Sequence, residues 1–248
     1  MSITDAISER NFHKLKNLNN QYVFEIVEKY VSICKPDKVT IISDSIEDIE
    51  YVKELAIKNG EERKLSTFGH TVHFDGYFDQ GRDKDSTKIL IEEGMSLSQT
   101  INTGKRKECL DEIFSMMKGI MEGKEMLVSF FSLGPCNSYF MVPALQITDS
   151  AYVLHSEHIL YRHGYEEFKR LGNTPDFFHF VHSAGKLDSR GVSIEYSKKR
   201  IYIDILGNRV FTINSQYAGN TVGLKKLALR LAIHKANNED WLCEHMFL

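Results

Sequence analysis

Apolar residues recur at the three- and four-residue spacing of an amphipathic helix in five parts of the chain. The helices predicted from this spacing span residues 21–35, 46–58, 110–121, 157–171 and 224–231. Pro36 ends the first helix, because proline has no N–H to donate and restricts the residue before it. Asp44 or Ser45 is suited to cap the second helix, which would place Ile46 on its buried side. Gly172 stops the fourth helix.

Short apolar or alternating runs predict the strands. These runs span residues 39–43, 88–91, 126–131, 142–147, 151–155, 192–196, 200–205 and 209–213. The last two flank Gly207-Asn208, which suits a hairpin turn, so we expect them to be antiparallel neighbours. Because strands and helices are interleaved and at least one hairpin is present, the predicted fold class is α/β. We expect a single mixed-sheet domain with flanking helices over residues 1–248.

Composition allows a full core and argues against general polyanion binding. Hydrophobic residues make up 42% of the 248 residues and aromatic residues 11%, which is enough to bury a core without disulfides or metal. The 31 Lys and Arg nearly balance the 34 Asp and Glu, for a formal net charge of −3. We therefore expect no nucleic acid and no membrane as a partner, and local groups must bind any anionic ligand.

The cysteines and the N-terminal segment indicate a reducing compartment. The four cysteines form no CxxC pair, so no zinc knuckle or redox motif is present; they are Cys34, Cys109, Cys136 and Cys243. The first 21 residues lack the apolar stretch of a signal peptide, and no run approaches the roughly 20 apolar residues that cross a bilayer. A cytoplasmic location is expected.

Histidines provide one candidate site. Three pairs have the i, i+3 spacing that places both rings on one face of a helix: His70/His73, His155/His158 and His179/His182. His70, His73 and Asp75 resemble the first ligands of a metallohydrolase, although the HExxH spacing is missing. They lie in a polar segment, residues 63–95, that is long enough to be a functional loop. Incidental histidines are the alternative interpretation of all three pairs.

A junction near the C-terminus provides a second candidate. From Ser215 to Lys226 a strand end runs through small residues into a helix that begins with two lysines. Such a junction offers backbone N–H groups and a positive helix end to an anion. An ordinary strand–helix loop fits the spacing equally well. The chain contains neither GxxxxGK[ST] nor GxGxxG, so no nucleotide-binding loop is recognisable in it.

Several blocks, taken in order along the chain, resemble GTP-dependent phosphoenolpyruvate carboxykinases. The blocks are KPDK (35–38), FSLGP (131–135), LQITDSAYV (145–153), FVHSAG (180–185), YAGNTVGLKK (217–226) and WLCEHM (241–246). They resemble the family's QPDK, FSMGP, LTDSPYV, CLHSVG, YGGNSLLGKK and WLAEHM, which belong to its N-terminal domain. The resemblance implies that oxaloacetate loses carbon dioxide and that the enolate then takes the γ-phosphoryl group of GTP to give phosphoenolpyruvate.

The same resemblance implies that part of the enzyme is missing from this chain. Family members continue into a C-terminal P-loop domain, which binds most of the GTP and supplies a metal-binding aspartate and further arginines. The chain ends at Leu248, before those elements. We therefore expect the missing P-loop domain as a partner and expect residues 1–248 to be inactive alone.

The resemblance also implies site residues. Lys226 and His245 match two ligands of a catalytic Mn²⁺, one per site. Mg²⁺ is a further ion that could accompany the nucleotide. A lysine ligates only as a neutral amine, so the metal and burial must depress its pKa. A solvated helix lysine is the alternative interpretation of Lys226.

The resemblance also implies which residues bind the substrate carboxylate. Tyr217, Ala218 and Gly219 match the substrate-contacting YGG of the family, and Asn220 braces that loop. Arg82, in GRDKDSTK, matches the arginine that forks the carboxylate, a role suited to a bidentate guanidinium. An ordinary loop arginine is its alternative.

Two other functions stay open at this point. One is a stand-alone, non-catalytic binding or regulatory protein built on the same domain. The other is a metallohydrolase, which requires His70, His73 and Asp75 to converge. The carboxykinase hypothesis instead requires Arg82, Tyr217 and the metal ligands to surround one cleft.

Overall fold

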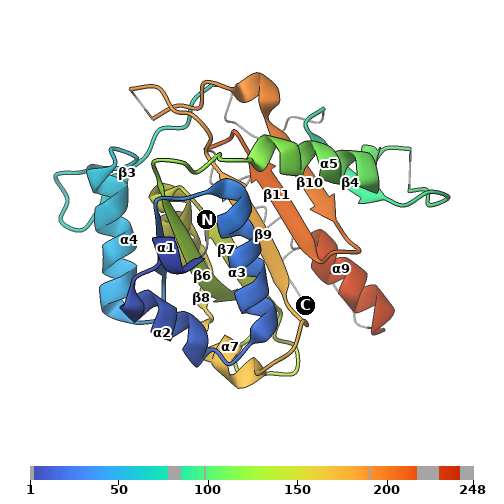
Figure 1. Ribbon diagram of the computed structural model, residues 1–248, viewed down its shortest axis with the longest axis horizontal. Helices are drawn as coiled ribbons and strands as arrows, with labels where there is room; N and C mark the ends of the chain where they lie inside the picture. Colours follow the sequence, from blue (N-terminus) through green and yellow to red (C-terminus); the bar gives the residue numbers. More distant parts are fainter. Residues whose placement is uncertain (1–2, 78–84, 98, 190, 217–228, 241–248) are drawn as a thin grey trace.

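The computed structural model describes residues 3–77, 85–97, 99–189, 191–216 and 229–240. Within these ranges one sheet of nine strands forms the centre of the molecule, and its path runs β1-β6-β7-β9-β11-β10-β4-β5, with β8 beside β6 (Figure 1). Its strands are β1 (Lys38–Ile41), β4 (Thr87–Ile91), β5 (Thr103–Lys105), β6 (Glu125–Ser132), β7 (Pro143–Thr148), β8 (Arg162–His163), β9 (Phe178–Ser183), β10 (Arg200–Asp204) and β11 (Arg209–Ile213). A separate hairpin pairs β2 (Arg63–Lys64) with β3 (Thr71–Val72).

Helices cover both faces of this sheet. One face packs against α1 (Ile3–Ala6), α2 (Glu9–Asn17), α3 (Gln21–Cys34), α5 (Arg106–Met117) and α7 (Tyr165–Leu171), and the other against α4 (Ile46–Lys58) and α6 (Ala151–Leu160). In Figure 1, α3 and α5 lie in front of the sheet, and α9 (Leu229–Asn238) lies at the lower right. The strands are parallel and antiparallel in one sheet, which confirms the predicted mixed α/β fold.

Several predicted elements are confirmed. The strands expected at 39–43, 88–91, 126–131, 142–147, 200–205 and 209–213 form within two residues of those bounds. The hairpin turn contains Asn208 at φ 47°, and β10 and β11 are antiparallel as expected. Ser45 caps α4 by accepting a hydrogen bond from the Asp48 N–H. The helix predicted from Gln21 is α3, which Lys35 ends in a left-handed conformation before Pro36.

The expected burial of Ile46 is wrong. Its side chain is 75% exposed, whereas Asp48, Val52 and Ala56 are buried. These three residues follow one another at i, i+4 spacing and define the inner stripe of α4. Ile46 precedes the stripe by two positions and therefore points away from the sheet.

The strand predicted at 151–155 is also wrong, because this segment begins the helix α6. Two anchors account for the helix. The Ser150 hydroxyl accepts a hydrogen bond from the Val153 N–H at 3.2 Å, and the Glu61 carboxylate accepts from the N–H groups of Ala151 and Tyr152. An acceptor and a carboxyl group at this end satisfy N–H groups that otherwise lack partners.

Two further boundaries differ from expectation. The helix predicted over 157–171 is divided: α6 ends at Leu160, β8 follows, and α7 begins at Tyr165 and stops at Gly172, whose φ is 71°. Residues 192–196 form no strand; a bridge at Ser193 and a 3-10 helix over Tyr196–Lys198 replace it. In the last predicted helix, 224–231, residues 224–228 lie outside the described residues, and α9 includes the rest.

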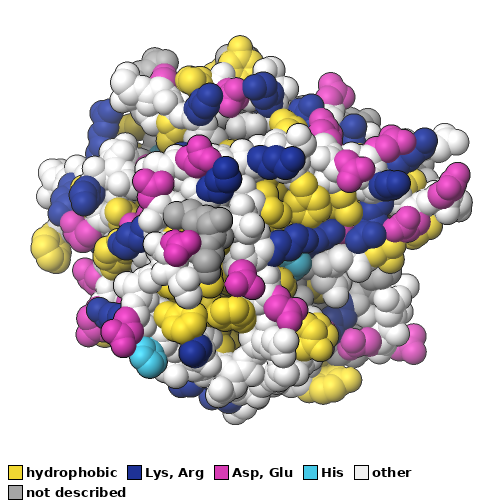
Figure 2. Space-filling view, viewed as in Figure 1, with side chains coloured by type: hydrophobic (Ala, Val, Ile, Leu, Met, Phe, Trp, Pro, Cys, Tyr) yellow, Lys and Arg dark blue, Asp and Glu magenta, His cyan; other side chains and the backbone are white. Residues whose placement is uncertain are grey.

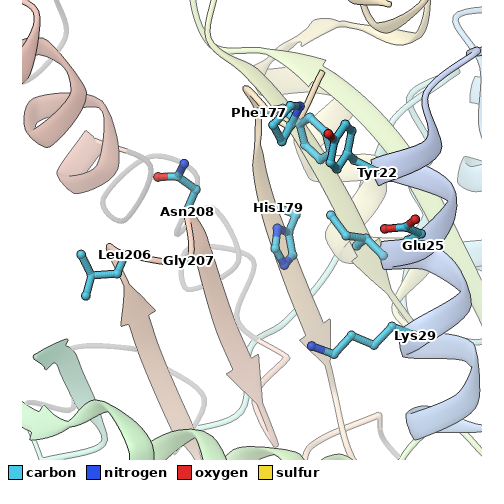
Figure 3. A pocket seen from close by; sticks show the side chains of 10 residues that line it. Tyr22, Glu25, Lys29, Phe177, His179, Leu206, Gly207 and Asn208 are labelled. Atoms are coloured by element: carbon cyan, nitrogen blue, oxygen red, sulfur yellow. The ribbon is translucent and has the colours of Figure 1, made fainter. Parts of the chain in front are cut away.

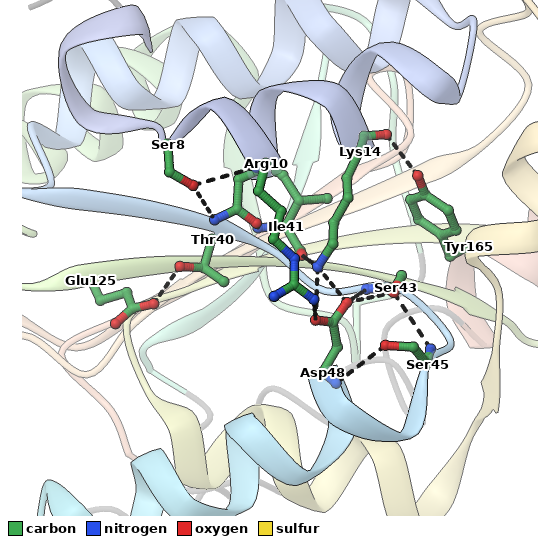
Figure 4. A network of polar contacts seen from close by, with 11 residues as sticks. Ser8, Arg10, Lys14, Thr40, Ile41, Ser43, Ser45, Asp48, Glu125 and Tyr165 are labelled. Atoms are coloured by element: carbon green, nitrogen blue, oxygen red, sulfur yellow. Dashed lines mark hydrogen bonds and ion pairs between the residues drawn. The ribbon is translucent and has the colours of Figure 1, made fainter.

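The N-terminal helices are attached to the sheet by a partly buried ion pair (Figure 4). Lys14 of α2 donates to both carboxylate oxygens of Asp48, at 2.7 and 2.6 Å, and to the Ile41 carbonyl at 3.1 Å. The Ser43 N–H donates to the same carboxylate at 2.8 Å. Burial alone would raise the pKa of Asp48, but the hydrogen bonds from Lys14 and Ser43 lower it. The pair connects α2, the end of β1 and α4.

The surface agrees with the composition. Figure 2 shows Lys and Arg side chains interspersed with Asp and Glu over the visible face, as expected for a formal net charge of −3. None of the helices within the described ranges is long and apolar enough to span a membrane.

Glu157 of α6 is an unusual buried acid. Its relative exposure is 0%, and neither carboxyl oxygen has a hydrogen-bond partner among the described residues. Burial raises the pKa of Glu157 well above its usual 4.5, so the side chain is protonated in the folded protein at pH values where it is ionised in the unfolded chain. Stability is therefore lost as pH rises above that ordinary value, until the folded-state pKa is reached.

We predict that Glu157→Gln removes this pH dependence. The free energy of unfolding of the variant relative to the wild type should grow by up to about 1.4 kcal/mol per pH unit above the ordinary glutamate pKa. Denaturant unfolding from pH 4 to 8 measures the difference. Glu50→Gln, at an exposed position of α4, is the control and should stay parallel to the wild type. A constant difference between Glu157→Gln and the wild type would show that Glu157 is ionised in the folded state.

Candidate functional site

Three neighbouring parallel strands end at one edge of the sheet. β7 is parallel to β9, and β9 is parallel to β11, so residues 149–150, 184–185 and 214–216 all follow strand ends at this edge. In open α/β sheets ligands bind outside the carboxyl ends of parallel strands. We call this place the carboxyl edge and treat it as the candidate site.

One row of paired residues crosses the sheet next to this edge. Thr148 pairs with His182, His182 with Thr212, Thr212 with Ile201, and Ile201 with Thr87. Neighbouring strands lie about 4.8 Å apart, so Thr87 and Thr212 are separated by about 10 Å. The start of β4 therefore lies at the same edge as the end of β11.

Asp149 organises the loops after β7 and β9. Its side chain is fully buried, and it accepts hydrogen bonds from the Ala184 N–H at 2.8 Å and the Ser183 hydroxyl at 2.6 Å. Lys124 donates to Asp149 at 2.7 Å and to the Gly185 carbonyl at 2.6 Å. A buried carboxylate with a cation and two further donors is well satisfied, so these loops are held in one arrangement.

Gly185 permits a close approach to the segment that follows β11. Its φ is +68°, and a Cβ at this position would lie 2.1 Å from Asn214 Oδ1 and 3.2 Å from the Asn214 Cα. Only glycine combines this conformation with this contact without strain. The loops after β9 and β11 are therefore in direct contact at the carboxyl edge.

His182 links β7 to the residue that follows β11. The ring is buried, and its Nε2 lies 2.6 Å from the Ser215 carbonyl oxygen, while Nδ1 lies 2.6 Å from the Thr148 hydroxyl. Because a carbonyl only accepts, Nε2 carries the proton, and Nδ1 accepts from Thr148. Burial lowers the pKa of His182, which favours this neutral ring. His182 thus holds the backbone two residues before Tyr217.

A buried acid continues this network behind the edge. The Thr148 hydroxyl also accepts from the Ser150 N–H at 3.0 Å, and the Ser150 hydroxyl donates to Glu61 at 2.5 Å. Burial raises the pKa of Glu61, against the opposing effect of the hydrogen bonds it accepts. The network connects α6 and the segment after α4 to the end of β11.

All residues that the carboxykinase resemblance assigns to substrate or metal lie outside the described residues. They are Arg82, Tyr217, Ala218, Gly219, Asn220, Lys226 and His245. Their described neighbours are informative for two of them. Arg82 precedes Thr87 by five residues and Tyr217 follows Thr212 by five, and these two threonines belong to the row described above.

The three histidine pairs have separate surroundings. His179 and His182 lie on a strand, so their rings point to opposite faces of the sheet. His155 pairs with Glu62 at 2.7 Å, whereas the ring of His158 lies 3.2 Å from the Ser129 hydroxyl. In neither of these two pairs do both rings face one place where a metal ion could bind.

The hypothetical metallohydrolase triad does not form a metal site. His73 Nδ1 lies 2.6 Å from the Glu61 carbonyl, and its Nε2 lies 3.4 Å from Asp75. His70 is exposed. Across the described ranges, no group of three or more His, Cys, Asp or Glu side chains could hold a metal ion.

One resembling block lies away from the carboxyl edge. Residues 131–135 include the last two residues of β6 and the three that follow it. Because β6 is antiparallel to β7, they lie at the opposite end of the sheet. The blocks 145–153 and 180–185 end at the carboxyl edge, and β11 leads there into 217–226. Thus only some of the resembling sequence blocks meet at the carboxyl edge.

Sequence reasoning missed the polar groups that hold the edge together. Asp149 and Lys124 had no assigned role, and His182 was considered only as a member of a histidine pair. Their contacts join residues 25 to 61 positions apart. One feature of the sequence could have indicated these groups. The polar residues Thr148-Asp149-Ser150 and His182-Ser183 each follow a buried apolar run. Such residues at strand ends mark loops that need side-chain anchors.

The chain matches the family model described as phosphoenolpyruvate carboxykinase N-terminal domain over residues 25–237. Among curated proteins it is 52% identical over 246 residues to "Phosphoenolpyruvate carboxykinase [GTP]" of Pyrococcus horikoshii, covering 99% of this chain and 40% of the relative. The protein of the same name from Thermococcus kodakarensis is 54% identical over 242 residues, covering 98% and 39%. That from Chlamydia caviae is 31% identical over 239 residues, covering 92% and 39%. The chain thus spans about 40% of the length of the first relatives.

We predict that Gly185→Ala destabilises the protein more than Gly123→Ala. Both glycines have positive φ, +68° and +77°, but nothing lies within 4 Å of a Cβ at Gly123. The control should cost about 1 kcal/mol of unfolding free energy from backbone strain alone, and Gly185→Ala about 2–4 kcal/mol. Denaturant unfolding of both variants measures the costs. Equal costs would contradict the close contact with Asn214.

Proposed function

The chain belongs to the phosphoenolpyruvate carboxykinase family, and we propose that it is the substrate-binding N-terminal part of a cytoplasmic enzyme that uses GTP. The proposed reaction converts oxaloacetate and GTP to phosphoenolpyruvate, GDP and carbon dioxide. The relatives that carry this name are about 2.5 times as long as the aligned region, since it covers 40% of their length. We propose that a C-terminal domain binds most of the nucleotide.

The convergence of strand ends is the observation that best supports this proposal. The chain segments that lead to Arg82 and Tyr217 start from one row of the sheet, about 10 Å apart. A dicarboxylate such as oxaloacetate is short enough to contact groups from both segments. The resemblance assigned these residues to one substrate, and the topology brings their described neighbours to one edge.

Each proposed substrate contact has a definite chemical task. The Arg82 guanidinium would form two parallel hydrogen bonds with a carboxylate, and the Gly219 N–H would add a third. Tyr217, Ala218 and Asn220 would shape the same loop. One carboxylate of oxaloacetate leaves as carbon dioxide, and these contacts would hold the other. The enolate oxygen is then positioned for phosphoryl transfer.

The metal ligands are proposed from the resemblance. Lys226 and His245 are the proposed ligands of Mn²⁺, and both lie outside the described residues. Lys124 donates to Asp149, and His182 donates to the Ser215 carbonyl. These side chains form no metal-binding group among the described residues. When bound, the metal would neutralise charge during phosphoryl transfer.

We predict that phosphoenolpyruvate formation requires the rest of the protein. The 248-residue chain should give no GTP-dependent product, and a fusion to the C-terminal part of the Thermococcus kodakarensis relative should give it from oxaloacetate. A coupled assay for phosphoenolpyruvate measures both. Activity of the 248-residue chain alone would contradict the proposal that a C-terminal domain is needed to bind the nucleotide. A folded, GTP-binding fusion without activity would favour a non-catalytic role.

We further predict that Arg82→Ala weakens oxaloacetate use in the active fusion. Loss of a bidentate charge-assisted contact, about 1.5–3 kcal/mol, should raise KM about 10- to 100-fold. Arg63→Ala, on the exposed strand β2, is the matched control and should leave KM unchanged. An unchanged KM in Arg82→Ala would exclude Arg82 from the substrate site without affecting the family assignment.

A further inference from the structure

A pocket lies at the end of the sheet opposite the carboxyl edge (Figure 3). It has a volume of about 380 Å³ and is open to solvent between α3 and the turn of the β10–β11 hairpin. His179, near the start of β9, forms its floor. Pockets of this size accept small organic molecules. Since β9 and β11 are parallel, this pocket lies at their starts, and the candidate substrate site lies at their ends.

His179 provides a neutral polar group at the floor. Burial, together with the charges of Arg209 and Lys29, lowers the pKa of His179 to about 3. The Tyr30 hydroxyl lies 3.4 Å from the Nε2 atom of the His179 ring, within hydrogen-bond distance. Nδ1 has no partner among the described residues. A neutral imidazole with one unused nitrogen can hydrogen-bond to a polar ligand without adding charge.

Lys29 is a cation without an acidic partner in the described part of the chain. Its ammonium lies 4.7 Å from the Phe114 ring centre and 5.7 Å from that of Tyr30. Burial and the neighbouring Arg209 guanidinium both lower the pKa of Lys29. Arg209 itself is paired with Asp204 at 2.8 Å. A carboxylate beside Lys29 would relieve the repulsion between the two cations.

The same helix face carries an acid and an apolar wall. Glu25 lies one turn before Lys29 on α3, and both line the pocket. The Gln21 amide donates to one Glu25 carboxylate oxygen at 2.8 Å, and Glu25 forms no ion pair with Lys29 in the described part of the chain, although i, i+4 spacing permits one. Tyr22, Phe177 and Leu206 form the apolar part of the lining, and the Leu206 side chain is 53% exposed. Figure 3 shows Tyr22 and Phe177 at one end of the pocket and Lys29 at the other.

We propose that this pocket binds a zwitterionic ligand with an apolar side chain, an α-amino acid of the aromatic or branched type. Its carboxylate lies against Lys29, its ammonium against Glu25, and its side chain against Tyr22, Phe177 and Leu206. A purely anionic ligand would be repelled by Glu25 and a purely cationic one by Lys29, so the two charges select a molecule that carries both. This inference does not depend on the proposed carboxykinase reaction.

The test is a titration of the full chain with L-phenylalanine, followed by ¹H–¹⁵N NMR. We expect saturable shifts of the amides of Phe177, His179 and Asn208, which border the pocket. L-Phenylalaninamide lacks the carboxylate and N-acetyl-L-phenylalanine lacks the ammonium, and both should bind at least about fivefold more weakly. No saturable shift, or equal binding of the three compounds, would overturn the proposal.

Two charge variants assign the contacts. Lys29→Gln should weaken L-phenylalanine binding about fivefold and abolish the preference for it over the amide, because the carboxylate contact is lost. Glu25→Gln should abolish the preference over the N-acetyl compound. Lys16→Gln and Glu28→Gln are matched controls, since Lys16 also lies over a ring, that of Phe12 at 4.5 Å, and Glu28 is exposed on α3. Unchanged selectivity in Lys29→Gln and Glu25→Gln would show that the ligand binds elsewhere.

Discussion

The parallel alignment of β7, β9 and β11 is the constraint on which the rest of the account depends. It makes three chain segments leave the sheet at one edge, and it makes the same strands begin at the opposite edge. Two buried side chains, His182 and Asp149, form hydrogen bonds between the loops at these strand ends, and the bonds require this arrangement of strands. Side-chain hydrogen bonds therefore hold together the loops of the carboxyl edge, near the proposed substrate segments, and the pocket lies at the other end of the same strands.

Local pattern was sufficient to predict most of the sheet, because its strands are buried apolar runs or alternate regularly. It failed at 151–155, where an apolar run is equally compatible with a strand or a helix. The deciding groups were Glu61 and Ser150, which accept hydrogen bonds from the N–H groups at the start of α6. Glu61 is 90 positions away from Ala151 in the sequence, so no local pattern could include it.

The site shows the same division between local and long-range information. Ordered blocks of sequence pointed to the family and to Arg82, Tyr217 and Lys226, and the family is confirmed by comparison with known proteins. The roles of those three residues stay predictions, because they lie outside the described residues. The supporting contacts of His182 with Thr148 and Ser215 were not predictable, because they depend on the order of strands in the sheet.

Hydrogen–deuterium exchange of the active fusion with and without oxalate, a dicarboxylate probe, tests the central claim most directly. If substrate binds at the carboxyl edge, oxalate should slow exchange in the segments 183–187 and 213–217, which leave β9 and β11 there. Exchange in 133–141 and 175–179, at the other end of the sheet, should not change. Slower exchange confined to those latter segments would contradict the account.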